Sequence, residues 1–277
     1  MDDKKIICIY HGGCTDGFGA AFAVWKKFGD AVEYHKGVYG YAPPDCTGHD
    51  VYIVDFSYKR DVMEQIARVA NSVTVLDHHK TAREDLEGLL ESGVVRGEFD
   101  MGRSGAVITW QYLHDTPVPQ LLLHIQDRDL WKFEFEETKN IVAALFSRPF
   151  EFTAWDYYTR PLGENDLPLL ALEGDAINRA HRQYVEKLKE HTRHLVICGY
   201  AVPTVNCPWW FASDVAGELS EGHALGATYM QMKDNIVFNL RTRRDDIDVS
   251  EIAKRYGGGG HAKAAGFAVR HLGELQG

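Results

Sequence analysis

The chain has few cysteines, and they do not form recognisable pairs. There are five, they are scattered along the sequence, and none of them builds a Cys-X-X-Cys motif: Cys8, Cys14, Cys46, Cys198 and Cys207. An odd, scattered set argues against a disulfide framework and against a zinc finger. We therefore expect a protein of a reducing cytoplasm.

Long apolar segments and an excess of positive charge are also missing. No apolar run approaches the roughly 18 residues of a membrane span, and the N-terminal MDDKKIICIY lacks the pattern of a secretory signal. Lys and Arg total 30 against 40 Asp and Glu, which gives a formal net charge of −10. This balance predicts no broad surface for long duplex nucleic acid. Short phosphorylated substrates stay compatible, because one basic pocket or a bound divalent metal can reverse the local field.

What the first half does contain is a series of short apolar runs that alternate with helical segments. We expect strands over Lys5–Tyr10, Val32–Val38, Val51–Val54 and Val73–Leu76, separated by helices near Phe18–Phe28, Lys59–Ala70 and Ala82–Leu90. Continuous apolar strands between helices indicate βαβ units and a mainly parallel sheet that is covered on both faces. The predicted fold class is therefore α/β, with a doubly wound sheet.

The second half predicts a smaller domain of mixed character. A helical stretch runs from Ser104 to about His194, and short strands and helices return from about Leu195. We expect a catalytic domain over residues 1–150, a helical connector over 151–194, and a C-terminal mixed α/β domain over 195–277.

Three of the expected early strands end in residues that can bind a metal. The first runs into His11, with Asp16 five residues later; the third runs into Asp55, and the fourth into Asp77-His78-His79. Ligands bind outside the carboxyl ends of strands in open α/β sheets, so these groups should converge. Any one of them alone is more often a cap or a turn former. Together they predict a ligand cluster for manganese, iron, zinc or magnesium.

Five motifs follow one another in the order of a known family. They are HGGCTDG at His11–Gly17, VDFS at Val54–Ser57, LDHHK at Leu76–Lys80, IQDRDLW at Ile125–Trp131 and GGGGHAKAAGF at Gly257–Phe267. The sequence resembles the DHH phosphoesterase superfamily, in which a DHH domain precedes a DHH-associated C-terminal domain, as in nanoRNases and RecJ-like exonucleases. The resemblance covers almost the whole chain. It implies a metal-dependent phosphoesterase with its active site in the cleft between the two domains.

The resemblance also implies roles for single residues. One or two divalent ions, commonly Mn2+ with Mg2+, Zn2+ or Fe2+ as alternatives, would be held by five residues: His11, Asp16, Asp55, His78 and Asp127. Asp55 would bridge the ions, His79 would face the substrate phosphate, and Asp77 would orient a neighbouring imidazole. Asp129 is the alternative to Asp127 within the same motif, although a salt bridge at a helix end also explains it.

One position departs from the family pattern. The first motif usually carries two aspartates separated by one residue, and this chain has Cys14 at the first of them. A thiolate can bind a softer metal such as zinc or iron, whereas a buried thiol would leave one metal site incomplete. Simple packing of a small buried residue is the third interpretation.

The C-terminal motif predicts the substrate-binding part of the site. The family places a recognition arginine and a glycine-loop histidine there, and the matching residues are Arg241, Gly258, Gly259, Gly260 and His261. Backbone amides of consecutive glycines can approach an anion closely, and a guanidinium can hold phosphate with two hydrogen bonds. A flexible turn is the alternative for the glycines, and a solvated strand edge is the alternative for Arg243 and Arg244. Ser104 could serve phosphate at a helix start, or could be an ordinary N-cap.

The leading functional hypothesis is hydrolysis of small phosphate esters by metal-activated water. The expected substrates are short oligonucleotides, cyclic dinucleotides or phosphorylated nucleotides, with no long duplex nucleic acid and no membrane as partner. Two alternatives remain open: a pyrophosphate or polyphosphate hydrolase, and a nucleotide-binding sensor whose catalysis is impaired.

Overall fold

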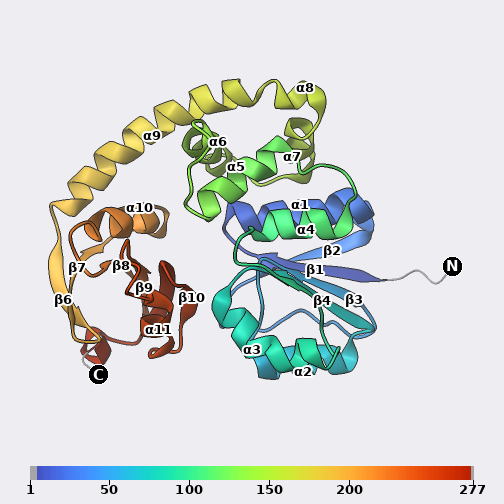
Figure 1. Ribbon diagram of the computed structural model, residues 1–277, viewed down its shortest axis with the longest axis horizontal. Helices are drawn as coiled ribbons and strands as arrows, with labels where there is room; N and C mark the ends of the chain where they lie inside the picture. The colour runs from blue at the N-terminus through green and yellow to red at the C-terminus, as the bar shows by residue number, and fades with distance from the viewer. Residues whose placement is uncertain (1–4, 276–277) are drawn as a thin grey trace. The chain divides into compact units, whose positions relative to one another are not determined.

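The computed structural model describes residues 5–275 and separates into two compact units, Met1–Asn178 and Arg179–Gly277. Each unit has its own sheet (Figure 1). Each also has its own buried apolar core. The division falls inside the long helix α9 (Leu167–Lys189), within the segment that the sequence assigns to a connector.

The N-terminal unit is built on a five-stranded sheet in the order β2-β1-β3-β4-β5. Every neighbouring pair in this sheet is parallel. The strands are β1 (Ile6–His11), β2 (Val32–Gly37), β3 (Asp50–Val54), β4 (Ser72–Asp77) and β5 (Arg96–Phe99). The parallel sheet confirms the predicted fold class. The expected set of strands did not include β5, because its sequence RGEF holds a single large apolar residue.

Helices cover both faces of this sheet, as Figure 1 shows. α1 (Thr15–Phe28) and α4 (Gly105–Leu113) lie on one face, and α2 (Arg60–Val69) and α3 (Lys80–Glu91) lie on the other. The central strands are therefore buried on both sides, and Ile9, Ile53 and Val75 are 0% exposed. The remaining helices of the unit are α5 (Gln120–Asp129), α6 (Thr138–Phe146), α7 (Phe152–Tyr158) and α8 (Pro161–Glu164).

The chain reverses its direction of winding at β1. β2 and β3 lie on opposite sides of β1, so the loops that leave β1 and β3 diverge at the carboxyl edge of the sheet. Such a switch point is where open α/β sheets bind their ligands. A ligand site is therefore expected among the residues that follow β1 and β3.

The C-terminal unit contains a mixed six-stranded sheet in the order β10-β11-β9-β8-β7-β6. β7 and β8 pair in parallel, and the other neighbouring pairs are antiparallel. The strands are β6 (Arg193–Ile197), β7 (Tyr200–Asn206), β8 (Gly226–Gln231), β9 (Ile236–Arg241), β10 (Gly259–His261) and β11 (Ala264–Val269). The unit also contains α10 (Trp209–Leu219) between β7 and β8, α11 (Val249–Lys254), the end of α9 and a short 3-10 helix (Leu272–Leu275). Across residues 5–275, no helix combines the length and apolarity that crossing a membrane requires.

Candidate metal centre

Polar residues from three neighbouring strands meet at the carboxyl edge of the parallel sheet. His11 ends β1, Asp55 directly follows β3, and His78 directly follows β4. Asp55 has a left-handed backbone with φ 52°, and its amide donates to the Leu76 carbonyl of the neighbouring strand. Asp and Asn adopt this conformation more readily than most residues. The strand thus turns sharply at Asp55 and holds its carboxylate 2% exposed.

The Asp55 carboxylate lies between two groups of donor atoms. On one side, Oδ2 lies 3.4 Å from His11 Nδ1 and 3.5 Å from Cys14 Sγ. On the other side, Oδ1 lies 3.2 Å from His78 Nε2. We call the first group, His11, Cys14 and Asp55 Oδ2, the sulfur-containing group. The second, which we call the oxygen-rich group, is built around His78 and Asp55 Oδ1.

Two more carboxylates complete the oxygen-rich group. His78 Nε2 lies 3.4 Å from Asp129 Oδ2 and 3.8 Å from Asp16 Oδ2. Asp16 and His78 are buried, whereas the Asp129 side chain is 32% exposed. Asp16, His78 and Asp129 together have the spacing of a metal-binding set. The group therefore offers three carboxylate oxygens and one imidazole nitrogen.

The start of helix α4 holds Asp16 in place. The Asp16 carboxylate accepts hydrogen bonds from the amides of Gly105 (2.7 Å) and Ala106 (3.1 Å). These are orphan amides at the positive end of a helix dipole, which favours a carboxylate. A Cβ on Gly105 would lie 2.4 Å from the Asp55 Cβ, so glycine is what allows α4 to approach the site. Ser104 caps the same helix by accepting from the Val107 amide, which is the ordinary N-cap role.

Asp77 acts on the neighbouring imidazole of His79. Asp77 is fully buried, and its Oδ1 lies 2.7 Å from His79 Nδ1 and accepts from the His78 amide at 2.7 Å. This contact fixes the orientation of the His79 ring and directs its Nε2 away from Asp77. The ring of His79 also contacts that of His11 edge-on, with centroids 6.0 Å apart.

The Asp127 carboxylate contacts the loop that follows α5, and its role as a metal ligand stays a prediction. The carboxylate accepts from the amides of Glu134 (2.8 Å) and Phe135 (3.1 Å) and from Thr138 Oγ1 (2.6 Å). Asp127 thereby organises the loop that follows α5 and lies outside every donor group found among residues 5–275. Asp129, two residues later in the same motif, lies beside His78, with 3.4 Å between its Oδ2 and His78 Nε2.

The crowding of like charges perturbs the acidity of the cluster. Burial, together with the carboxylates of Asp55 and Asp129, raises the pKa of Asp16 well above its usual value. Burial would also raise the pKa of Asp55, but the adjacent imidazoles of His11 and His78 lower it well below its usual value. Burial would lower the pKa of His78, but Asp55 and Asp129 raise it to about 10. Buried carboxylates gathered in this way favour a nearby positive charge.

The donor set fits a divalent metal. Among residues 5–275, Asp55 Oδ1 is a buried oxygen without a hydrogen bond of good geometry, although His78 Nε2 lies near it. A cation would satisfy this oxygen and offset the surrounding carboxylates. Imidazoles combined with carboxylates are ligands that manganese, iron and zinc accept, and carboxylate-rich sets favour harder ions. The residues present therefore suit one ion on each side of Asp55.

Comparison with known proteins agrees with this fold. No family model matches the sequence. An uncharacterized protein, R106, of Acanthamoeba polyphaga mimivirus is 29% identical over 296 residues, which cover 96% of this chain and 68% of the viral protein. The oligoribonuclease NrnB of Bacillus subtilis is 27% identical over 79% of this chain and 59% of its own length. The chain thus spans just over two thirds of one of these curated relatives and less than that of the other.

Two solved structures share the architecture. The DHH domain of a member of a family of ribosomal proteins aligns with a TM-score of 0.64 and 14% identity, over 99% of this chain and 84% of that one. An exonuclease RecJ bound to manganese aligns with a TM-score of 0.51 and 15% identity, over 96% and 86%. At these identities the likeness concerns the fold. The chain thus shares its fold with these DHH-domain and RecJ proteins and is similar in sequence to the oligoribonuclease NrnB.

One residue beside the sulfur-containing group was not predicted from the sequence to lie at the site. Tyr39 lies in the loop after β2, and its ring centroid is 5.9 Å from that of His11 and 4.8 Å from that of Phe56. The residue is 56% exposed, so an aromatic surface is open to solvent next to the sulfur-containing group. A tyrosine in a loop rich in proline and glycine matches no motif, and only the fold brings it to His11.

The residues predicted to bind substrate lie in the C-terminal unit. Arg241 ends β9 and donates to Ser213 Oγ at 2.7 Å and to the Leu240 carbonyl at 2.9 Å. Gly259, Gly260 and His261 form β10, which pairs with β11. A Cβ on Gly258 would lie 2.1 Å from the Gly266 carbonyl oxygen, so close strand packing requires glycine there. A role of these residues in substrate binding stays a prediction.

The other arginines that follow β9 have exposed ionic partners. Arg243 lies 3.5 Å from Glu221, and Arg244 forms a two-bond contact with Asp246. Such pairs are typical of a solvated strand edge, which was the alternative interpretation of this sequence.

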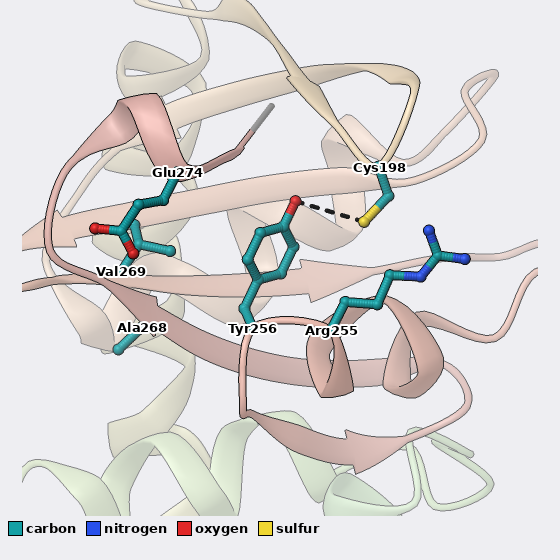
Figure 2. Close-up of a pocket in the computed structure, with 6 residues that line it drawn as sticks. All are labelled: Cys198, Arg255, Tyr256, Ala268, Val269 and Glu274. Carbon is teal, nitrogen blue, oxygen red and sulfur yellow. Dashed lines mark hydrogen bonds between the residues drawn. The ribbon is translucent and has the colours of Figure 1, made fainter. Parts of the chain in front are cut away.

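The C-terminal unit also has a cavity of about 340 Å³, which lies apart from the residues predicted to bind substrate (Figure 2). Its lining includes Cys198, Arg255, Tyr256 and Glu274, and Cys198 Sγ lies 3.5 Å from Tyr256 Oη. Arg255 and Glu274 carry opposite charges, so the lining provides no net charge for an anion. None of the residues predicted from the motifs lines this cavity.

Proposed function

We propose that the chain is a divalent-metal-dependent phosphoesterase that hydrolyses short oligoribonucleotides or comparable small nucleotide phosphodiesters. The observation that carries the proposal is the position of Asp55, whose two carboxylate oxygens each face a separate group of donor atoms. A carboxylate shared by two cations is a recurring feature of two-metal phosphoryl hydrolases.

Six residues would hold the metals. They are His11, Cys14 and Asp55 on one side, and Asp55, Asp16, His78 and Asp129 on the other. When bound, divalent ions supply an activated water at neutral pH and offset charge on the phosphoryl oxygens. Manganese is the metal that we expect by analogy with the RecJ structure of the same fold.

The remaining steps would fall to side chains next to the metals. Asp77 fixes the His79 ring through Nδ1, which orients Nε2 for a hydrogen bond to a phosphate oxygen. Asp16, held by the amides of α4, cannot swing away from the cluster without losing two hydrogen bonds. This anchoring keeps the donor atoms in position, and position dominates catalysis of phosphoryl transfer.

The choice of short nucleotides rests on three observations. The relative that has a named activity, at 27% identity, is an oligoribonuclease. The net charge of −10 disfavours a long phosphate backbone, which is bound through many cationic contacts. The exposed ring of Tyr39 beside His11 offers a surface on which a base can stack. Arg241 and His261 are the residues that we expect to contact the rest of the substrate.

The test is a hydrolysis panel with manganese, in which the wild type is compared with Asp55→Asn. Asn tolerates the left-handed backbone of Asp55 as well as Asp does, so the fold should be kept. We expect turnover of short oligoribonucleotides, reduced at least about 100-fold in the variant because a shared ligand is lost. Asp246→Asn, which alters an exposed carboxylate of the C-terminal unit, is the matched control.

The panel also contains cyclic dinucleotides, a 3′-phosphorylated adenosine nucleotide and pyrophosphate. Turnover of pyrophosphate alone would replace the proposal with a pyrophosphate hydrolase. Tight nucleotide binding without turnover, whichever metal is supplied, would replace it with a sensor. A folded and fully active Asp55→Asn protein would contradict the role given to Asp55.

A further inference from the structure

The three donor atoms of the sulfur-containing group form a nearly regular triangle. His11 Nδ1 and Cys14 Sγ are 3.4 Å apart, His11 Nδ1 and Asp55 Oδ2 are 3.4 Å apart, and Cys14 Sγ and Asp55 Oδ2 are 3.5 Å apart. The three residues come from the end of β1, the N-cap of α1 and the turn after β3. Separate elements of the fold thus direct one nitrogen, one sulfur and one oxygen to a common point.

This spacing matches a tetrahedral metal site. Zinc binds sulfur at about 2.3 Å and imidazole or carboxylate at about 2.0–2.2 Å, so tetrahedral angles put such donors about 3.3–3.6 Å apart. All three distances in the sulfur-containing group lie in this range. Three protein donors would leave a fourth position open, as catalytic zinc sites do.

The oxygen-rich group has a different chemistry. It offers carboxylate oxygens of Asp16, Asp55 and Asp129 and a single nitrogen of His78, with 3.2–3.8 Å between that nitrogen and the oxygens. Hard cations such as Mn2+ and Mg2+ prefer oxygen ligands, whereas thiolate selects softer ions such as Zn2+ and Fe2+. The two sides of Asp55 therefore differ in their donor atoms: one side offers a sulfur, and the other offers mainly oxygens.

Helix capping alone does not account for a cysteine at this position. Cys14 is the N-cap of α1, and its sulfur accepts a hydrogen bond from the Gly17 amide at 3.1 Å. Ser, Asp and Asn are the preferred N-caps, and any of them would make this bond better. The sulfur that accepts this bond also faces His11 Nδ1 and Asp55 Oδ2, and cysteine is a metal ligand as well as a cap.

We propose that the centre is selective for two different metals. The group of His11, Cys14 and Asp55 Oδ2 takes a thiophilic divalent ion of the Zn2+ or Fe2+ type. The group of Asp16, His78, Asp129 and Asp55 Oδ1 takes a hard ion of the Mn2+ or Mg2+ type. This inference rests on the proposed two-metal function and specifies which ion each half of the centre holds.

Cobalt titration of the metal-depleted full chain tests the inference without relying on activity. Co2+ bound to a thiolate gives a sulfur-to-cobalt charge-transfer band in the near ultraviolet. We expect this band in the wild type, its loss in Cys14→Ser and Cys14→Asp, and its retention in Cys198→Ser. Ser and Asp both keep the N-cap of α1, so the variants should fold. Cys198, also partly buried but in the β6–β7 turn, is the matched control.

Metal content measured by mass spectrometry gives a second readout. After incubation with equal Zn2+ and Mn2+, the wild type should retain one of each ion. Cys14→Asp should weaken zinc retention at the first group at least about 10-fold and admit a second manganese, because a ligand has changed. No charge-transfer band in a wild type that binds two manganese ions and hydrolyses nucleotides would overturn this inference and leave the proposed function intact. A folded chain that binds no divalent ion would overturn both.

Discussion

The carboxylate cluster of the N-terminal unit and the arginines that follow β9 in the C-terminal unit differ in how their charges are balanced. In the N-terminal unit, the carboxylates of Asp16, Asp55 and Asp129 gather around the single imidazole of His78. Burial and mutual repulsion raise the pKa of Asp16, and burial raises that of Asp129. Such an arrangement costs free energy unless a cation joins it.

At the end of β9 in the C-terminal unit, charged side chains have partners within the unit. Arg241 donates to Ser213, and the exposed pair of Arg244 and Asp246 is complete in itself. A metal-binding centre can therefore be recognised as a group of buried carboxylates for which the protein itself supplies too little positive charge. A charged group that already has a partner of opposite charge gives no sign of a bound ion. Substitutions in the carboxylate cluster should therefore affect metal binding, whereas substitutions of paired charges should affect stability alone.

The largest effect should separate two aspartates of one motif. Asp129→Asn removes a carboxylate beside His78, so we expect metal affinity to fall about 10- to 100-fold, with hydrolysis falling alongside it. Asp127→Asn weakens three hydrogen bonds to a carboxylate instead, and should lower the free energy of unfolding by about 1–3 kcal/mol. Calorimetric manganese titration and urea unfolding measure the two effects. Loss of metal binding in Asp127→Asn alone would restore the original assignment.

A smaller effect should follow from adding one methyl group at the start of α4. In Gly105→Ala the new Cβ would lie 2.4 Å from the Asp55 Cβ, so either α4 or Asp55 must move. We expect weaker manganese binding and a loss of stability of about 1–3 kcal/mol, as for other overpacked sites. Gly258→Ala is the matched variant in the C-terminal unit, because its Cβ would meet the Gly266 carbonyl oxygen. It should lose stability while the manganese affinity stays at the wild-type value; equal affinity losses in both would contradict the account.

The smallest effect concerns a buried ion pair remote from the metal ligands in sequence. Burial would raise the pKa of Asp156, but Lys26, at 2.6 Å, and Arg160 lower it below its usual value. This contribution to stability is present above the unfolded pKa of about 3.9 and is lost as the pH falls through the lower folded value. Asp156→Asn should therefore destabilise by about 1–2 kcal/mol at neutral pH and by less below about pH 4.

Urea unfolding across this pH range checks the prediction. Asp246→Asn, which removes the acid of an exposed pair, should change the unfolding midpoint little at any pH. A destabilisation of Asp156→Asn that does not depend on pH would show that packing, and not charge, explains the effect.

Much of the centre was predictable because parallel strands end at one edge. Apolar runs predict β1, β3 and β4. His11 at the end of β1 lies close to Asp55 after β3, and Asp55 lies close to His78 after β4. Asp127 and Asp129 could not be distinguished, because residues two apart on a helix point to nearly opposite faces and the sequence does not say which face meets the sheet. Tyr39 was missed for a related reason: its loop reaches His11 only through the folded path of the chain.

The C-terminal glycines lie in a secondary structure that differs from the expected one, while their role in substrate binding stays a prediction. Gly259 and Gly260 were expected in a loop that cradles an anion, and they lie in the short strand β10. Consecutive glycines fit both contexts, because the absence of a Cβ permits close approach of either an anion or a neighbouring strand. Conversely, Gly105 gave no signal as a site residue, although it is where α4 meets Asp55.

The central claim is that Asp55 is shared by two metal ions of different chemistry. Anomalous X-ray scattering from crystals grown with Mn2+ and Zn2+, recorded at the absorption edge of each metal, tests it most directly. The account predicts two ions, with zinc beside His11 and Cys14, manganese beside Asp16, His78 and Asp129, and one oxygen of Asp55 on each. A single ion, or an ion bound by Asp127, would contradict it.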